Sequence, residues 1–182
     1  MSEQHFIWLD LETTGLNPST NRILEVAAVA TDANLKVLGT YNKVLEYSEY
    51  DLEYSQLHPD VVRMHTDNGL FEDCKKSVAT HTQVDAELVE WAASLKLGEK
   101  PLLAGNTVHF DKAFLAEHMP LFNGVLHYRI LDVSTIKEML RNFYNLKIPK
   151  ASGNHRAAND VHASIDEFQK YRSILKLDMS GY

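Results

Sequence analysis

The sequence has few of the features that mark secreted or membrane-bound proteins. Cys74 is the single cysteine among 182 residues, which excludes an intrachain disulfide framework and favours a reducing cytoplasm. No stretch approaches the roughly 20 apolar residues of a membrane span. The first apolar run, at residues 6–16, contains acids and lacks the basic flank of a signal peptide. We therefore expect a cytoplasmic protein.

Positive charge is also scarce, because 18 Lys and Arg residues face 25 Asp and Glu residues, for a formal net charge of −7. A protein that coats long duplexes by neutralising phosphates is normally basic. An acidic enzyme can still bind a short nucleic acid through metal ions and a few chosen cations. The length and the hydrophobic content of 45% are typical of one globular domain, which we expect to span residues 1–182.

The most informative stretch is FIWLDLETTGL at residues 6–16. Its apolar start predicts a strand that is buried on both faces. Asp10 and Glu12 are two residues apart, which on a strand places both carboxylates on one face, about 7 Å apart. The following Thr-Thr-Gly ends the strand, so the acids lie at its carboxyl end, where open sheets bind ligands. Paired carboxylates at the edge of a core favour a bound cation, although a strand end that reaches solvent has the same pattern.

The remaining pattern predicts an α/β fold. Strands are expected at residues 23–31 and 35–45, which with the first strand form an antiparallel three-strand meander. Further strands are expected at 101–105 and 126–133, and helices at 58–64, 69–76, 85–97, 110–118, 134–144 (capped by Ser134) and 157–175. Residues 145–154 are expected to move. Strands first, then alternating helices and strands, favour a mixed sheet flanked by helices.

Three residues far along the chain are further candidates for the site that contains Asp10 and Glu12. Asp111 and Asp160 fall near the starts of predicted helices, and His155 precedes Asp160 by five residues. A first-turn acid also stabilises the helix dipole, so neither acid alone indicates a site. On one helix His155 and Asp160 would point roughly 140° apart, so they converge only if His155 lies in the turn before the helix. His109 and His162 are interpreted as bystanders.

Together these residues supply four carboxylates and a base. Hard divalent ions such as Mg²⁺ and Mn²⁺ take oxygen ligands, and four acids suit two of them. Two such ions stabilise both the attacking and the leaving oxygen of a phosphoryl displacement. A neutral histidine can remove the proton from the attacking water. The pattern is therefore typical of a metal-dependent phosphoryl displacement in which water attacks.

Three segments resemble the exonuclease motifs of the DEDD superfamily, in its histidine-bearing branch. They are DLETTGL at 10–16, Gly105-Asn106 with Asp111, and HRAAND at 155–160. Within that branch, HYRILDVST at 127–135 and Met-His-Thr at 64–66 resemble the oligoribonucleases. The resemblance implies a ribonuclease H-like fold and a 3′→5′ exonuclease that acts as a homodimer on very short RNAs, dinucleotides above all.

The resemblance also implies a role for each motif residue. It assigns two Mg²⁺ or Mn²⁺ ions to Asp10, Glu12, Asp111 and Asp160, with His155 as the general base. The substrate contacts that it implies are a Leu16 wedge against the bases, stacking by Tyr128 and a 5′-phosphate cap formed by Thr107, His127, Arg129 and Ser134. Tyr128 and Arg129 would be contributed across the dimer interface.

The chain departs from the oligoribonuclease pattern at two places in the expected substrate cleft. Thr13 and Phe110 are typical of the proofreading and ribonuclease T branches. The alternative is therefore a general single-strand 3′→5′ exonuclease acting on DNA or RNA, with an open cleft. In that enzyme Tyr128 and Arg129 would form an exposed loop pair without a role. A catalytically inactive binding module is disfavoured because all five catalytic residue types are present.

Overall fold

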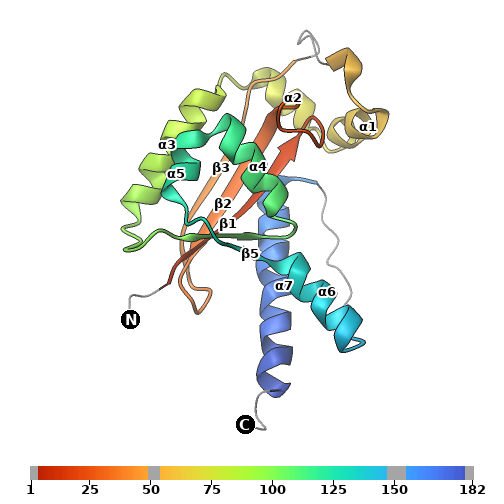
Figure 1. Ribbon diagram of the computed structural model, residues 1–182. Coiled ribbons are helices and arrows are strands. Elements are labelled where there is room, and N and C mark those ends of the chain that lie inside the picture. The colour runs from red at the N-terminus through yellow and green to blue at the C-terminus, as the bar shows by residue number, and fades with distance from the viewer. Residues whose placement is uncertain (1–3, 49–53, 147–154, 179–182) are drawn as a thin grey trace.

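A five-stranded sheet, in the order β3-β2-β1-β4-β5, forms the centre of the computed structural model, which describes residues 4–48, 54–146 and 155–178 (Figure 1). β1 (Phe6–Thr13), β2 (Ile23–Thr31) and β3 (Val37–Val44) form an antiparallel meander. β4 (Leu102–Gly105) runs parallel to β1, and β5 (Ile130–Asp132) runs parallel to β4. The predicted mixed sheet with its three-strand meander is thus confirmed.

Helices surround this sheet. They are η1 (Tyr54–Gln56, a 3₁₀ turn), α1 (Pro59–Asp67), α2 (Leu70–Lys76), α3 (His81–Ser94), α4 (His109–His118), α5 (Pro120–Val125), α6 (Val133–Phe143) and α7 (Ala157–Asp178). Among the described residues, no helix combines the length and the apolar character needed to cross a membrane. Part of the segment that was predicted to move, residues 147–154, lies outside the described residues.

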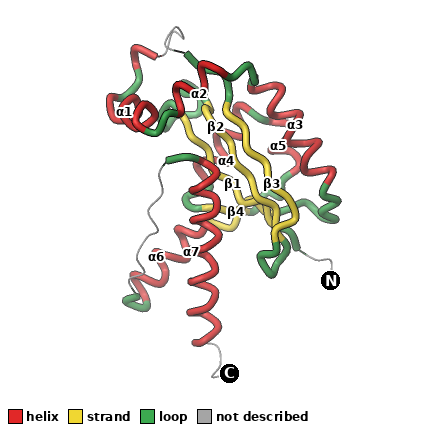
Figure 2. The backbone as a smooth tube through the Cα atoms, turned by 180° about the vertical axis from the view of Figure 1, so that it is seen from behind, coloured by secondary structure: helices red, strands yellow, loops and turns green. Residues whose placement is uncertain are grey.

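The two faces of the sheet are covered by different helices. Ile7, Leu9 and Leu11 of β1 face a core formed with α3, α4 and α5. Trp8 points to the opposite face, where α6 and α7 pack, and its ring centroid lies 5.3 Å from that of Phe168. Figure 2 shows α6 and α7 together, apart from α3 and α5. Side chains alternate between faces along a strand. The two acids that follow Trp8 at even positions therefore lie on the face covered by α7.

Helix α3 begins four residues earlier than predicted, at His81. Thr80 and Gln83 form a capping box: the backbone N–H of Gln83 donates to Thr80 Oγ1 at 3.3 Å, and that of Thr80 donates to Gln83 Oε1 at 3.0 Å. This reciprocal pair satisfies two amides that a helix start leaves without partners. The sequence prediction of residues 85–97 missed this box.

Helix α5 was not predicted from the sequence. In the structure Pro120 starts a new helix, a position where proline is well tolerated. The buried carboxylate of Asp85, from α3, accepts hydrogen bonds from the amides of Leu121 at 3.0 Å and Phe122 at 2.7 Å. A residue 36 positions away thus caps α5, which no local pattern reveals.

The last strand is shorter than the predicted 126–133, since β5 covers only residues 130–132. The cap of α6 was also assigned wrongly to Ser134. Asp132 is the N-cap, and its Oδ1 accepts the backbone N–H of Ser134 at 2.9 Å. An aspartate is a strong N-cap, and this assignment leaves the Ser134 hydroxyl free for contacts beyond the helix.

Candidate active site

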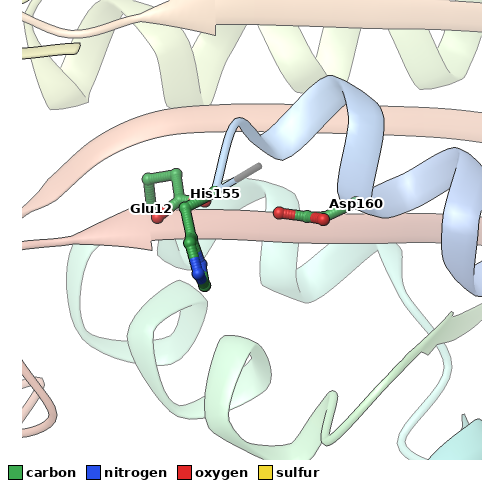
Figure 3. Close-up of side chains that lie close together, drawn as sticks. All are labelled: Glu12, His155 and Asp160. Atoms are coloured by element: carbon green, nitrogen blue, oxygen red, sulfur yellow. The ribbon is translucent and has the colours of Figure 1, made fainter. Parts of the chain in front are cut away.

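The end of β1 and the start of α7 bring together three of the predicted site residues. Glu12, His155 and Asp160 each offer a ligand atom, and these atoms all lie within 4.8 Å of one another (Figure 3). Glu12 comes from β1, Asp160 from the first turn of α7, and His155 from the turn before that helix. The histidine thus lies outside the helix, where convergence with Asp160 requires it.

The second-motif acid reaches β1 from the opposite side. Asp111 lies in the first turn of α4 and is only 4% exposed. Its Oδ1 accepts the backbone N–H of Leu11 at 3.0 Å. Since Leu11 separates Asp10 from Glu12, this hydrogen bond places Asp111 beside both strand acids. All four predicted carboxylates therefore converge at the carboxyl ends of β1 and the starts of α4 and α7.

This clustering disfavours the ionised carboxylates when no cation is present. Burial, and then repulsion by Asp10 and Asp160, raises the pKa of Glu12 to about 8. Burial and then Asp10 also raise the pKa of Asp111, although the hydrogen bond from Leu11 opposes the shift. Hard divalent cations bind carboxylate oxygens and relieve such repulsion. The residues present therefore fit the divalent metal ions expected from the sequence.

A buried histidine adjoins this site and was not assigned a role from the sequence. His65 of α1 is completely buried, and its Nε2 lies 3.0 Å from the carbonyl oxygen of Thr13 and 4.0 Å from Glu12 Oε2. A carbonyl only accepts, so Nε2 carries the proton and donates to Thr13. Burial lowers the pKa of His65, which favours the neutral ring. His65 thereby ties α1 to the end of β1.

A polar cluster lies at the carboxyl ends of β4 and β5. The N–H of Thr107 donates to Asp132 Oδ1 and to Ser134 Oγ, both at 3.0 Å, and the hydroxyl oxygens of Thr107 and Ser134 are 3.0 Å apart. His109 Nδ1 lies 3.3 Å from Asp132 Oδ2. Two of the four predicted cap residues, Thr107 and Ser134, therefore meet. Sequence reasoning missed Asp132, and it took His109 for a bystander because its partner is 23 positions away.

The His127-Tyr128-Arg129 segment forms a separate exposed stack. The rings of His127 and Tyr128 lie 4.5 Å apart and nearly parallel, Arg129 Cζ lies 5.3 Å from the centre of the Tyr128 ring, and Tyr128 is 73% exposed. The segment precedes β5, whereas Ser134 follows it. At about 3.3 Å per residue, β5 separates the stack from the cluster by about 10 Å. Within one chain, the stack and the polar cluster therefore lie at opposite ends of β5.

Leu16 is the remaining predicted contact residue. It lies in the turn after β1, and its side chain is 84% exposed. Single exposed apolar side chains are common on protein surfaces, so this exposure leaves Leu16 accessible to a ligand or partner. The turn itself is fixed: Thr14 Oγ1 accepts the N–H of Arg22 at 2.9 Å, and Asn21 Oδ1 accepts that of Asn17 at 3.0 Å.

Comparisons with known proteins agree with this geometry. Residues 7–168 match the family described as Exonuclease. The chain is 37% identical to the oligoribonuclease of Baumannia cicadellinicola over 95% of both chains. It is also 37% identical to that of Photobacterium profundum, over 94% of this chain and 96% of the relative. The oligoribonuclease of Haemophilus ducreyi is 34% identical over 94% of each.

The fold is shared with solved exonucleases. A product-bound structure of exonuclease I superposes with a TM-score of 0.66 and 17% identity, covering 94% of this chain and 44% of the longer exonuclease. A zinc-bound complex of the Escherichia coli enzyme with single-stranded DNA gives a TM-score of 0.64 at 19% identity, over 97% of this chain and 42% of that one. The ribonuclease H-like fold predicted from the sequence is confirmed. The chain belongs to the oligoribonucleases, a family of 3′→5′ exoribonucleases within the DEDD exonuclease superfamily.

Proposed function

We propose that this protein hydrolyses very short RNAs, dinucleotides above all, to nucleoside 5′-monophosphates. The observation that carries the proposal is the convergence of Glu12, His155 and Asp160 within 4.8 Å, with buried Asp111 hydrogen-bonded to the same strand. This arrangement supports a site for Mg²⁺ or Mn²⁺ with a base beside it. Cys74 is a free, buried thiol, which suits a protein that works in the reducing cytoplasm.

The chain's own residues divide the chemistry between them. Asp10, Glu12, Asp111 and Asp160 hold two divalent cations, which when bound stabilise the attacking and leaving oxygens of the phosphodiester. His155 is exposed at the edge of the acidic cluster and removes a proton from the attacking water. Glu12 and Asp111 are nearly excluded from solvent, which strengthens their interaction with a cation.

The polar cluster around Thr107 and Ser134 is the proposed cap for the 5′ phosphate. Hydroxyl groups, together with the imidazole of His109, can donate hydrogen bonds to phosphate oxygens. Because the cluster follows β4 and β5, it lies at the same end of the sheet as the acids. A phosphate held there is close to the scissile bond only in the shortest substrates, and this selects against longer chains.

The proposed active form is a homodimer. Tyr128 and Arg129 lie at the opposite end of β5 from the cap in their own chain, so we assign them to the site of the partner subunit. There Tyr128 stacks on one base, and Arg129 and His127 bind the 5′ phosphate. Leu16, from the chain that carries the acids, wedges against the bases. The exposure of Leu16 and Tyr128, 84% and 73%, supports contacts of this kind.

A time course on 5′-labelled RNAs of two to seven nucleotides tests the proposal directly. With Mg²⁺ or Mn²⁺ we expect the dinucleotide to be cleaved fastest, with release of the labelled nucleoside 5′-monophosphate. A chelator should stop the reaction, because the carboxylates alone provide no Lewis acid. Equal rates for all lengths, or equal cleavage of DNA, would instead identify a general single-strand exonuclease.

Removal of the stacking residue should reduce the preference for short RNA. Stacking of a base on an aromatic side chain contributes about 1–3 kcal/mol, and a dinucleotide has only two bases. We therefore expect Tyr128→Ala to lower kcat/KM on the dinucleotide by about tenfold or more, and on a seven-nucleotide RNA by much less. Arg129→Ala should show the same pattern through lost phosphate contacts.

Tyr144→Ala is the matched control, since Tyr144 is 53% exposed at the end of α6. It should leave both rates near those of the wild type. Light scattering on each variant reports the oligomeric state. A monomeric protein with full dinucleotide activity, or equal losses on short and long RNA, would contradict the assignment of Tyr128 and Arg129 to the partner's site.

A further inference from the structure

Glu25 is a buried carboxylate that the proposed reaction does not use. It lies on β2, is only 1% exposed, and is paired directly with Glu12 in the β1–β2 register. Residues opposite each other in an antiparallel pair point to the same face of the sheet. A second acid beside a metal-binding acid adds repulsion, and burial of an uncompensated charge is costly. A partner for Glu25 is therefore required.

Arg156 is that partner. Its Nε and Nη2 donate to the two carboxylate oxygens of Glu25, both at 3.1 Å, and its Nη1 donates to Asp73 Oδ2 of α2 at 3.0 Å. This bidentate pair fixes the orientation of the guanidinium relative to the carboxylate, which a single hydrogen bond does not achieve. The arginine thereby joins β2 to α2.

Glu25 and Arg156 also form hydrogen bonds with the backbone at the start of α7. Glu25 Oε2 also accepts the backbone N–H of Ala157 at 3.1 Å, and the carbonyl oxygen of Arg156 accepts the N–H of Asp160 at 3.1 Å. Arg156 directly follows His155, whose own carbonyl accepts a hydrogen bond from Asn68 Nδ2. The backbone of His155 is left-handed, with φ +54°, a conformation that persists only when surrounding contacts hold it.

We propose that Glu25 and Arg156 are positioning residues that hold His155 where it can act on the attacking water. The inference rests on the function proposed above for His155. Neither residue is required to touch the substrate, because the Arg156 guanidinium is engaged by Glu25 and Asp73. Their effect is transmitted through the backbone between Arg156 and His155. A displacement of about 1 Å in a catalytic group can cost about 10²-fold in rate.

Kinetics of Arg156→Gln provide the first test. We expect kcat on the dinucleotide to fall by about 10–100-fold, the usual range for a residue that orients a catalytic group, with KM within about threefold of the wild type. Arg156→Lys keeps the positive charge but cannot form the paired hydrogen bonds of a guanidinium. It should therefore recover less than half of the rate that Arg156→Gln loses. Arg172→Gln is the control: Arg172 ties the same helix to the carbonyl of Ala33, far along α7, and kcat should not change.

A double variant distinguishes action through His155 from a general structural effect. If Arg156 acts only through His155, then His155→Ala with Arg156→Gln should be no slower than His155→Ala alone, within about twofold. Multiplied losses would overturn the proposal. Hydrogen exchange of the metal-free protein gives a readout that is independent of activity. Arg156→Gln should speed amide exchange at residues 157–160 by about tenfold, whereas Arg172→Gln should not.

Each remaining outcome is decisive. An unchanged kcat in Arg156→Gln overturns the positioning role, and unchanged exchange overturns the anchoring. If His155→Ala alone keeps the wild-type rate, the proposed role of His155 fails. The hydrogen-exchange result still tests whether Arg156 holds the start of α7 in place. Should Arg156→Gln fail to fold, Asp73→Asn removes only the outer ion pair, whose acid is 43% exposed. That variant should lower kcat by about twofold to fivefold, and a wild-type rate would overturn the proposal.

Discussion

Replacement of Glu12 by glutamine should lower the rate of RNA hydrolysis by about 10³-fold or more. Glu12 is 7% exposed and converges with Asp160 and His155, so its amide analogue loses the charge that holds a divalent cation. A bound metal ion contributes several kcal/mol to transition-state stabilisation, and each 1.36 kcal/mol corresponds to tenfold in rate. Steady-state rates on a labelled dinucleotide at several Mn²⁺ concentrations measure the loss.

The same substitution should stabilise the metal-free protein. Burial and the neighbouring acids raise the pKa of Glu12 from 4.5 to about 8 in the folded state. Between these values the folded chain keeps a proton that the unfolded chain releases, so the free energy of unfolding falls as pH rises through this window. Glutamine carries no charge at any pH. We therefore expect Glu12→Gln to raise the melting temperature in chelator at pH 8, and to have little effect near pH 4.5.

A gain of about 1 kcal/mol corresponds to about 2–4 °C for a chain of this size. Melting curves in chelator from pH 4.5 to 8.5 measure it, and Glu117→Gln, at an exposed position of α4, is the control. The expected combination is lost activity with gained metal-free stability. A variant that is both inactive and less stable at pH 8 would show that Glu12 is a structural acid, and an active variant would remove it from the metal site.

The acids could be predicted from the sequence because a strand's period of two fixes their relation. Asp10 and Glu12 lie on the face of Trp8, and that face is covered by α7. The position of His155 could also be predicted, from the period of the α-helix. Only a place in the turn before α7 allows His155 to approach Asp160, and the structure has it there. Local periodicity therefore sufficed wherever two site residues share an element or its immediate flank.

Contacts between distant elements were missed for the opposite reason. Glu25 is 131 residues from Arg156, and both appear in the sequence as ordinary charges until β2 and α7 are brought together. Asp132 was hidden within a predicted strand, although its N-cap role for α6 and its contact with Thr107 place it at the centre of the polar cluster. Buried ion pairs and caps across the fold are properties of packing, and no local pattern encodes them.

The position of the His127-Tyr128-Arg129 stack also required the structure. The family resemblance assigned Tyr128 and Arg129 to the partner's site, but the residues alone did not show where this segment lies relative to the cap, because strand direction is set by the parallel pairing of β4 and β5. That pairing puts the stack before β5 and the polar cluster after it. In the homodimer proposed above, this strand polarity would let one chain present the acids and the cap while its partner presents the stack.

Removal of the imidazole in His155→Ala should lower kcat by about 10²–10⁴-fold, the usual contribution of a general base. The carboxylates and the polar cluster remain in place, so binding of a labelled dinucleotide, measured by fluorescence polarisation with Ca²⁺, should stay within about threefold of the wild type. Loss of kcat with retained binding is the pattern expected when only the base is removed.

His162→Ala is the control, because His162 is exposed on α7, the helix that follows His155, and this variant should behave as the wild type. Since His155 is exposed, added imidazole can enter the space left by its side chain, and we expect partial recovery of the rate in His155→Ala but not in Glu12→Gln. A His155→Ala enzyme that retains the wild-type rate would place the base elsewhere. His109 would then be tested first, although its contact with Asp132 at 3.3 Å led us to include it in the proposed phosphate cap.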